Sequence, residues 1–536
     1  MSSQQLWWRD GVVYQIYPRS FQDSNGDGIG DLPGIESRLD YLVELGVDAI
    51  WISPFYPSPM ADFGYDVSDY TGVDPIFGSL ADFDRLIAAA HARGLKLILD
   101  FVPNHSSDQH PWFLESRSSR QSPKRDWYLW RDPAPGVNPT GPPNNWMSNF
   151  GGSGWTFDDA TGQFYFHSFL KQQPDLNWHN PELRQAIYAA MRFWLDRGVD
   201  GFRMDVLWLL AKDPEFRNNP PNPEWTPGAS DFWSVLPTYT ADQPETHAIV
   251  AEMRQLLDQY PERVLIGEIY LPVANLVAYY GKSLQGAHMP FNFHLIQTEW
   301  NADKIAHLIR DYEAALPEGA WPNWVMGNHD QSRAASRIGR SQARAAAMLL
   351  LTLRGTPTLY YGEELGMTNG PIAPQQVQDT AEKLRPGIGL GRDPQRTPML
   401  WNASEGAGFT TATPWLPINP GLLDTNVATE SADPQSMLSL YRRLLALRQT
   451  HPALHAGAIH DVQSEQGVLS FIRSFLDAHT GALQQFQIVL NLTADIQTIH
   501  CEPGHIALTT ILDGDGAPVG GPLIVEAGEG LLIRLQ

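Results

Sequence analysis

Acidic, basic and imidazole side chains stand at the ends of four short apolar runs in this sequence. The runs and their polar residues are DFVPNH with Asp100 and His105, GFRMDV with Arg203 and Asp205, LIGEIY with Glu268, and MGNHD with His329 and Asp330. Two neighbouring carboxyls can cleave a glycosidic bond if one attacks the anomeric carbon and the other, held protonated, donates to the departing oxygen. Arg203 lies on the same strand face as Asp205, so we expect its charge to keep Asp205 ionised.

A single carboxylate at a strand end has a simpler alternative role, because such residues commonly cap helices or form ion pairs. A shared site requires that the strands belong to one sheet. Eight strand candidates alternate with segments of helical period, which is typical of a parallel α/β sheet. They are residues 12–17, 49–53, 95–101, 201–205, 264–268, 288–291, 324–327 and 356–361.

We therefore predict an α/β fold with a closed (β/α)8 barrel, whose active site forms at the carboxyl ends of the strands. The helical periods predict helices over residues 35–45, 80–92, 181–196 and 342–353. Four such strand ends in barrel order make the shared site the better interpretation than four separate caps.

The chain of 536 residues exceeds the roughly 250 to 300 residues at which a single core stops growing, so additional domains are expected. We predict a first barrel part over 1–103, an inserted domain over 104–178 and a second barrel part over 179–455. The second part contains a loop-rich insertion over 368–417. Aromatic residues in 104–178 favour an ordered domain over disorder. Strand-like runs at 468–473, 487–491, 508–512 and 530–535 predict a C-terminal antiparallel β domain over 456–536.

The formal charge of -23, from 60 acidic and 37 basic residues, argues against nucleic acid and anionic membranes as partners. One cysteine, Cys501, excludes an intrachain disulfide framework. The start MSSQQLWWRDG lacks a basic segment followed by an apolar one, so we expect a cytoplasmic protein. The longest apolar run, 345–353, is far shorter than the ~20 residues that span a bilayer.

Seven ordered motifs resemble those of glycoside hydrolase family thirteen, the α-amylase family. They are GVDAIWISP (46–54), DFVPNH (100–105), QPDLNW (173–178), GFRMDV (201–206), EIY (268–270), NHD (328–330) and GTPTLYYGEELG (355–366). The resemblance implies that Asp205 is the nucleophile and Glu268 the acid/base, and that Asp330 holds sugar hydroxyls and stabilises the transition state. It further implies that the first sugar subsite is lined by His105, Arg203 and His329. The insertion corresponds to the family's B domain and the C-terminal strands to its C domain.

QPDLNW resembles the α-glucosidase and oligo-1,6-glucosidase branch, which implies exo-action on short sugars. In that branch ADFGYD and GRDPQRTPM suggest Asp62 and Arg392 as a clamp on glucose hydroxyls, with Tyr65 stacking under the sugar ring. Arg396 could replace Arg392 as the sugar contact or form a structural ion pair. Phe150 and Phe169 are either pocket walls or core of the inserted domain. The stretch 218–227 is expected to fold over the entrance and to limit substrate length.

The resemblance implies a retaining α-glucosidase that acts on maltose-like α-glucosides, with transfer to hydroxyl acceptors, because the transglucosylating members are the most similar. Val206 after the nucleophile is associated with α-1,6 preference, whereas the rest of the chain favours α-1,4, and we lean to α-1,4. A non-catalytic partner protein, like the transporter subunits of the same family, is the alternative from another functional class. The intact carboxylates disfavour it.

The loop DSNGDGIGD predicts a metal site, because Asp23, Asn25, Asp27, Asp31 and the Ile29 carbonyl offer hard oxygen ligands. Ca²⁺ or Mg²⁺ suits these ligands, and the same loop in this branch commonly carries a structural ion. The loop is not a complete EF-hand, since its twelfth position is Gly34 rather than glutamate. The alternative is a solvated acidic turn. No organic cofactor is expected.

Overall fold

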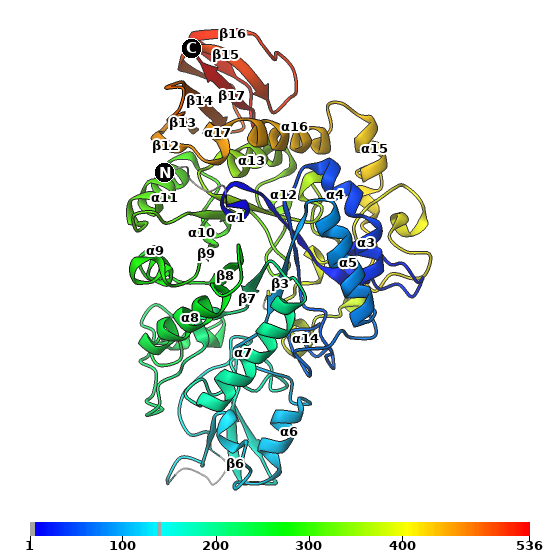
Figure 1. The fold of residues 1–536 in the computed structure, drawn as a ribbon, viewed down its shortest axis with the longest axis vertical. Helices are drawn as coiled ribbons and strands as arrows, with labels where there is room; N and C mark the ends of the chain where they lie inside the picture. Colours follow the sequence, from blue (N-terminus) through cyan, green and yellow to red (C-terminus); the bar gives the residue numbers. More distant parts are fainter. Residues whose placement is uncertain (1–5, 137–140, 388) are drawn as a thin grey trace.

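The fold is given by a computed structural model that describes residues 6–136, 141–387 and 389–536. Its centre is a parallel sheet of eight strands in the order β10-β11-β1-β2-β3-β7-β8-β9 (Figure 1). The strands are β1 (Val13–Ile16), β2 (Ala49–Ile52), β3 (Lys96–Phe101), β7 (Gly201–Met204), β8 (Val264–Ile269), β9 (Met289–Asn292), β10 (Asn323–Val325) and β11 (Thr356–Tyr360). Each overlaps one of the eight predicted runs, so the predicted barrel fold is confirmed.

The seam between the two end strands, β9 and β10, is bridged by a side chain. Asn323 Oδ1 accepts from the Asn292 N–H at 2.8 Å, and its Nδ2 donates to the Pro290 carbonyl at 2.6 Å. The inside of the barrel is filled by apolar side chains that include Val13, Trp51, Ile98, Ile266 and Phe291. The sheet therefore encloses a packed core, and a ligand has to bind at one end of it.

Two of the predicted helices, α5 (Leu80–Ala92) and α7 (Pro181–Asp196), have the expected bounds, because Ser79 and Asn180 cap their first N–H groups. The helix predicted over 342–353 is α13 (Arg340–Thr352). Among the described helices, none combines the length and apolarity that crossing a bilayer requires.

The single helix predicted over 35–45 is wrong, since the chain forms α3 (Leu32–Ser37) and α4 (Leu39–Leu45). Arg38 leaves the helical region between them, with φ -109° and ψ 7°. Its guanidinium donates to Gln22 Oε1 at 2.8 Å and lies 4.1 Å from the ring centre of Trp401. These tertiary contacts interrupt the helix at Arg38, where the spacing of apolar residues by itself predicts an unbroken helix.

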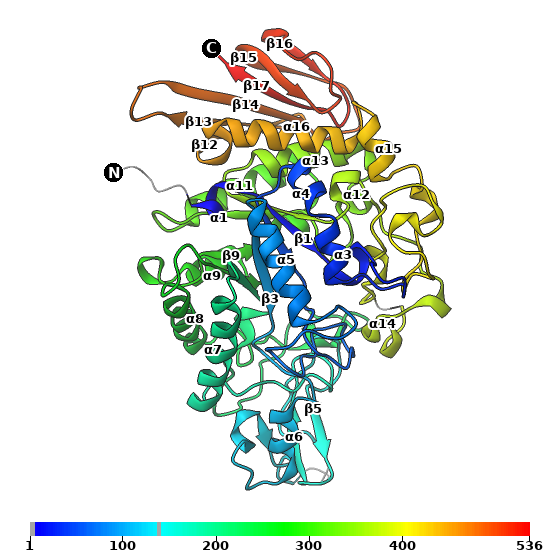
Figure 2. The ribbon, with the colours of Figure 1, turned by 45° about the vertical axis from the view of Figure 1, so that its right-hand side comes forward.

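The segment between β3 and α7 carries secondary structure of its own. It contains α6 (Pro111–Ser118) and an antiparallel sheet of β4 (Trp130–Arg131), β6 (Gln163–Phe166) and β5 (Trp155–Asp158). Leu129, Trp146, Trp155, Phe164 and Phe166 form its core. Its aromatic residues therefore pack together, as expected of an ordered segment. Figures 1 and 2 show α6 and this small sheet at the end of the molecule opposite to the C-terminal strands.

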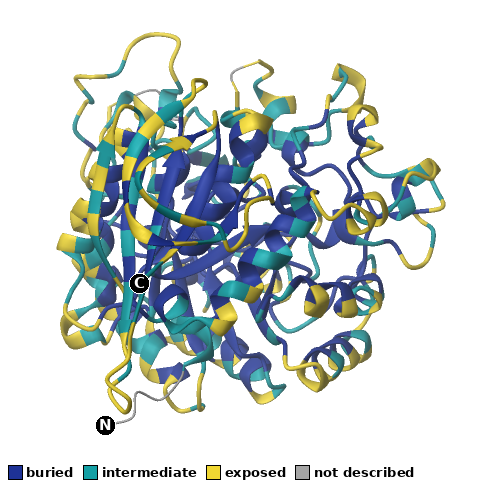
Figure 3. Cartoon of the chain, turned by 90° about the horizontal axis from the view of Figure 1, so that it is seen from above, coloured by how far each residue is buried: buried dark blue, intermediate teal, exposed yellow. Residues whose placement is uncertain are grey.

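The C-terminal strands follow α16 (Met437–Thr450) and form an antiparallel sheet in the order β12-β13-β14-β17-β15-β16. Their bounds are β12 (Ala458–Glu465), β13 (Val468–Leu476), β14 (Leu483–Asn491), β15 (Gln497–Thr509), β16 (Pro518–Val525) and β17 (Gly530–Leu535). Sequence patterns missed β12 and β16, the two edge strands, because most of their residues are exposed or half-buried. Figure 3 shows this contrast between the buried barrel strands and the more exposed C-terminal sheet.

Candidate active site

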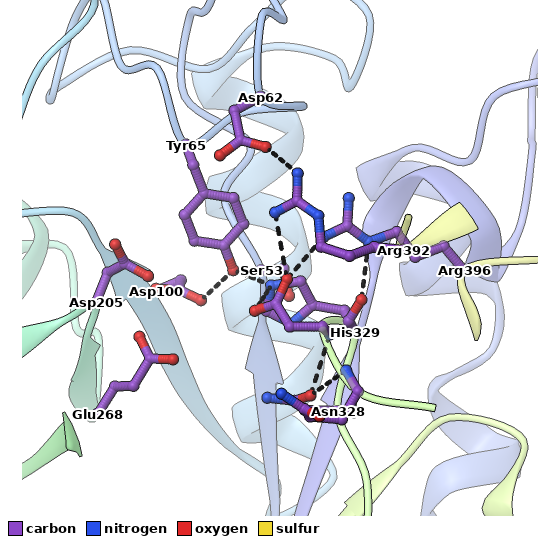
Figure 4. Close-up of polar contacts among 12 residues, drawn as sticks. Ser53, Asp62, Tyr65, Asp100, Asp205, Glu268, Asn328, His329, Arg392 and Arg396 are labelled. Atoms are coloured by element: carbon purple, nitrogen blue, oxygen red, sulfur yellow. Dashed lines mark hydrogen bonds and ion pairs between the residues drawn. The ribbon is translucent and has the colours of Figure 1, made fainter. Parts of the chain in front are cut away.

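One arginine, Arg203, connects the carboxyls at the ends of three barrel strands. Figure 4 shows these carboxyls, which belong to Asp100, Asp205 and Glu268, on one side of the site. Arg203 of β7 lies 2.9 Å from Asp100 Oδ1, 2.9 Å from Asp205 Oδ1 and 2.7 Å from Glu268 Oε2. Its side chain is fully buried, so these contacts are shielded from water. Because one guanidinium contacts both Asp205 and Glu268, the two carboxyls lie within reach of one ligand atom. The geometry therefore permits the two-carboxyl chemistry.

The backbone after β7 fixes both carboxyls. The Asp205 N–H donates to the Phe101 carbonyl at 2.8 Å, and the Val206 N–H donates to Glu268 Oε2 at 2.9 Å. Val206 has φ 37°, a left-handed conformation that is rare for a β-branched side chain. Strained backbone of this kind persists where surrounding structure enforces it, commonly at functional sites.

Burial raises the pKa of Asp205 well above its ordinary value, and the neighbouring Glu268 raises it further. Arg203 opposes this shift without cancelling it. Burial also raises the pKa of Glu268. Desolvation and the like charge therefore outweigh the guanidinium for the pair as a whole, and the expectation that Arg203 keeps Asp205 itself ionised stays a prediction. Two such carboxyls retain one proton between them over a pH range in which a solvated carboxyl is ionised.

Asp330, in the loop after β10, is the carboxylate that stays charged. Burial opposes its ionisation, but His329, Arg396 and Arg392 together hold the pKa of Asp330 well below its ordinary value. Arg396 Nη2 lies 2.8 Å from Asp330 Oδ1, and Arg396 Nε donates to the His329 carbonyl at 2.8 Å. Arg396 is fully buried. Of its two predicted roles, the structure shows the ion pair.

A second cluster holds the predicted clamp. Arg392 Nη2 lies 2.5 Å from Asp62 Oδ1, its Nη1 lies 3.4 Å from Asp330 Oδ1, and its Nε lies 2.8 Å from Asp379 Oδ2. Burial opposes ionisation of Asp379, but Arg392 lowers the pKa of Asp379 to about 2. Sequence analysis missed Asp379. Its only sequence signal is that of a helix cap, which it also is, since it accepts from the Ala381 N–H at the start of α14 (Thr380–Leu384).

Tyr65 and His105 lie between these clusters. The Tyr65 hydroxyl is 2.7 Å from His329 Nε2 and donates to Asp100 Oδ2 at 3.0 Å. His105 Nε2 lies 3.1 Å from the Tyr65 carbonyl, and burial lowers the pKa of His105 to about 4. His105 is therefore neutral near pH 7 and can hydrogen-bond a sugar hydroxyl without adding charge.

These residues surround a cavity of about 810 Å³. The predicted residues on its wall are Asp62, Tyr65, His105, Phe150, Phe169, Asp205, Glu268, Asp330 and Arg392. Arg203 and His329, which were expected to line the sugar subsite, lie fully buried behind the wall and hold the carboxyls in place. Phe150 and Phe169 contact each other, with ring centres 5.5 Å apart.

Loops after several strands supply wall residues that sequence analysis missed. They include Asn149, Gln173, Trp208, Phe232, Trp233, Tyr270, His294 and Gln297. The stretch 218–227, expected over the entrance, is not part of the wall. Instead Phe232 and Trp233, in the 3₁₀ turn η3 (Asp231–Ser234) that follows it, reach the cavity. Of these residues, Gln173 lies in the motif QPDLNW and Tyr270 in the motif EIY, and their place in a family motif was the sequence signal that could have identified them as wall residues.

The acidic loop after β1 folds around its own carboxylates. Asp23 accepts from the N–H groups of Asn25, Gly26 and Gly28 at 2.7 to 3.0 Å. Asp31 accepts from Gly34 at 2.7 Å and caps α3. Within the described ranges, no group of three or more His, Cys, Asp or Glu side chains is arranged to hold a metal ion. The oxygen donors still suit a hard cation, and Asn25 and Asp27 are exposed, so the metal site stays a prediction.

Comparison with known proteins gives consistent matches. The family model described as alpha amylase, catalytic domain, matches residues 15–457. A probable alpha-glucosidase of Rhizobium meliloti is 44% identical over 484 residues, 87% of each chain. An oligo-1,6-glucosidase of Halalkalibacterium halodurans is 40% identical over 95% of this chain and 94% of its own. The crystal structure of an alpha-glucosyl transfer enzyme superposes with a TM-score of 0.92 at 42% identity, covering 99% of this chain and 100% of that one.

Proposed function

This chain belongs to the α-amylase family, and we propose that it is a retaining α-glucosidase that removes the non-reducing-end glucosyl unit of short, maltose-like sugars and also transfers it to hydroxyl acceptors. The observation that carries this proposal is the buried Arg203, which joins Asp205 and Glu268 beside the cavity. An intact carboxyl pair at a cavity also speaks against a non-catalytic partner protein.

The proposed reaction has two displacements. Asp205 attacks the anomeric carbon and forms the glucosyl ester, while Glu268 gives its proton to the glycosidic oxygen of the departing sugar. Glu268 then takes a proton from water or another hydroxyl, whose oxygen attacks the same carbon and releases Asp205. Asp330, held by Arg396, is charged and can stabilise the positive charge that develops on the sugar ring. Asp62 and Arg392 bind the glucose hydroxyls.

Incubation with p-nitrophenyl α-glucoside, maltose and isomaltose, with and without an added alcohol, tests this function. We expect α-configured glucose from the first two and an α-glucoside of the alcohol when it is present. We lean to α-1,4 linkages, although Val206 favours the α-1,6 alternative. Faster cleavage of isomaltose than of maltose would establish the oligo-1,6-glucosidase instead, and absence of all products would reject the proposal.

We propose that the accepted length of the substrate depends on a bridge between loops that carry residues of the cavity wall. Arg385, after α14, lies 2.7 Å from Asp231 in η3, and its guanidinium occupies the space that a Cβ at Gly151 would fill. It therefore joins three segments that carry wall residues. We expect kcat/KM for maltose to exceed that for maltoheptaose, and Arg385→Ala to raise the maltoheptaose-to-maltose ratio up to about fivefold, since a half-exposed ion pair contributes roughly 0 to 1 kcal/mol.

Asp231→Asn should give the same direction of change. Arg197→Ala, which breaks an exposed pair with Asp84 on the outside of the barrel, serves as the matched control. An unchanged length preference in both bridge variants would contradict this role of the bridge.

The loop of Asp23, Asn25, Asp27, Ile29 and Asp31 is proposed to bind Ca²⁺ or Mg²⁺ for stability. A bound ion stabilises the folded state by an amount that grows with its concentration. We therefore expect EDTA to lower Tm by a few degrees, added Ca²⁺ to restore it, and Asp27→Ala to abolish this response. A Tm that is equal with EDTA and with millimolar Ca²⁺ or Mg²⁺ would mean that the loop is a solvated acidic turn.

A further inference from the structure

His329 is held between two tyrosine rings. Its ring centre lies 5.7 Å from that of Tyr17 and 5.3 Å from that of Tyr65, with interplanar angles of 17° and 4°. All three residues are buried. Stacking on both faces fixes the plane of the imidazole, but it does not decide which ring nitrogen carries the proton. That choice depends on the groups at the ring edge.

Gln15, a fully buried residue of β1, meets one edge of this ring. Its Nε2 lies 2.8 Å from His329 Nδ1 and 3.2 Å from Ser53 Oγ. With the amide in this orientation its nitrogen can only donate, so His329 Nδ1 accepts and carries no proton, and Gln15 Oε1 is left without a hydrogen-bond partner among the described residues. The neutral ring then has its proton on Nε2.

The other edge of the ring leads independently to the same tautomer. His329 Nε2 lies 3.2 Å from Asp330 Oδ2 and 2.7 Å from the Tyr65 hydroxyl. Asp330 is ionised beside Arg396 and Arg392, so it can only accept. A lone pair on His329 Nε2 would face this negative charge, whereas an N–H at that position is attracted by it.

The hydrogen bonds continue from His329 to the carboxyl pair. The Tyr65 hydroxyl accepts from His329 Nε2 and donates to Asp100 Oδ2 at 3.0 Å, and Asp100 is bound by Arg203. We propose that Gln15 is a positioning residue, which keeps His329 in the Nε2–H tautomer and so orients Asp330 and Tyr65 in the glucose pocket. The expected effect of Gln15 on catalysis rests on the proposed function, whereas the tautomer of His329 does not.

Gln15→Glu provides a pH-dependent test, because the introduced carboxyl has nearly the same shape as the amide. When protonated it can donate to His329 Nδ1 as the amide does, and when ionised it can only accept and favours the Nδ1–H tautomer. The charged and titratable groups facing His329 are Asp330, Arg396, Arg392, Arg203 and the two tyrosines. All are shared with the unmodified protein.

We expect the kcat of Gln15→Glu, relative to the unmodified protein, to be highest at low pH and to fall at least about tenfold as pH rises, because a wrong histidine tautomer can cost much more than this in other enzymes. Gln15→Met removes the donor without adding a titrating group, so its ratio should be independent of pH. A pH-independent ratio for Gln15→Glu would overturn the proposal.

The ¹⁵N NMR spectrum of histidine-labelled protein gives a test that needs neither activity nor a folded Gln15 variant. The His329 signals, assigned by their absence in His329→Gln, should show a protonated Nε2 and an unprotonated Nδ1. A protonated Nδ1 overturns the proposal even if the glucosidase activity is established. Conversely, the expected spectrum from a protein that cleaves no α-glucoside would reject the proposed function and leave the tautomer assignment intact.

Discussion

Asp205→Asn is expected to lower kcat/KM for p-nitrophenyl α-glucoside by about 10⁴-fold or more, which corresponds to about 5.5 kcal/mol of transition-state stabilisation. The amide nearly preserves the shape of the side chain and can still accept from Arg203, which lies 2.9 Å from Asp205 Oδ1. It lacks the charge and nucleophilicity needed to attack the anomeric carbon. Steady-state rates over a range of substrate concentrations measure the effect.

Asp48→Asn is the matched control, because it makes the same chemical change at the opposite end of the barrel. Asp48 precedes β2 and accepts from the Val12 N–H at 2.8 Å, a bond that asparagine can keep. We expect its kcat/KM to stay within about twofold of the unmodified value. If Asp205→Asn loses activity but unfolds cooperatively, as Asp48→Asn does, then the loss comes from the missing carboxylate and not from a failure to fold.

Asp205→Gly allows the attacked face of the sugar to be identified. Removing the side chain leaves room for azide to enter where the carboxylate stood and to displace p-nitrophenolate in one step. That single displacement inverts the anomeric carbon, so the expected product is β-glucosyl azide. Formation of α-glucosyl azide by this variant would assign the nucleophile to another residue.

Most of the barrel could be predicted because each strand has a local signature. Buried parallel strands such as β3 and β8 are mostly apolar runs, and each carries a carboxylate one residue before its carboxyl end, Asp100 and Glu268. The break at Arg38 and the edge strands β12 and β16 could not be predicted in this way. The break depends on contacts with Gln22 and Trp401, which are far away in the sequence, and edge strands bury too little to impose an apolar pattern.

The residues of the candidate site also fall into a group that the sequence predicts and a group that depends on tertiary packing. Asp205, Glu268 and Asp330 stand in short motifs at strand ends, so their convergence follows from the barrel itself. Asp379 and Trp233 lie on long loops, whose path depends on packing with other loops. The charge state of Asp205 was also beyond sequence patterns. Spacing identifies Arg203 as its neighbour, but the opposing effects of burial and Glu268 appear only once the side chains are placed in space.

Glu268→Gln is expected to affect two steps, proton donation to the leaving sugar and proton removal from the attacking water. Substrates with different leaving groups distinguish these two steps. Maltose has a poor leaving group that needs the proton of Glu268, so its kcat/KM should fall about 10³-fold or more. p-Nitrophenolate departs without a proton, so formation of the glucosyl ester at Asp205 should be only mildly slowed. Its hydrolysis still needs a base, and a burst of p-nitrophenolate equal to the enzyme concentration should therefore precede slow turnover.

Azide and pH then complete the assignment of Glu268. Azide needs no deprotonation, so it should accelerate turnover of the glucosyl ester in Glu268→Gln and give α-glucosyl azide, the anomer opposite to that from Asp205→Gly. In the unmodified protein the protonated form of Glu268 is the active one, and burial raises the pKa of Glu268. Maltose cleavage should therefore persist above the pH at which a solvated glutamate ionises. It should decline at the higher pH at which Asp205 and Glu268 lose their shared proton. Glu268→Gln should lack that decline. Equal losses on maltose and p-nitrophenyl glucoside, with no burst and no effect of azide, would show that Glu268 holds the site together without transferring a proton.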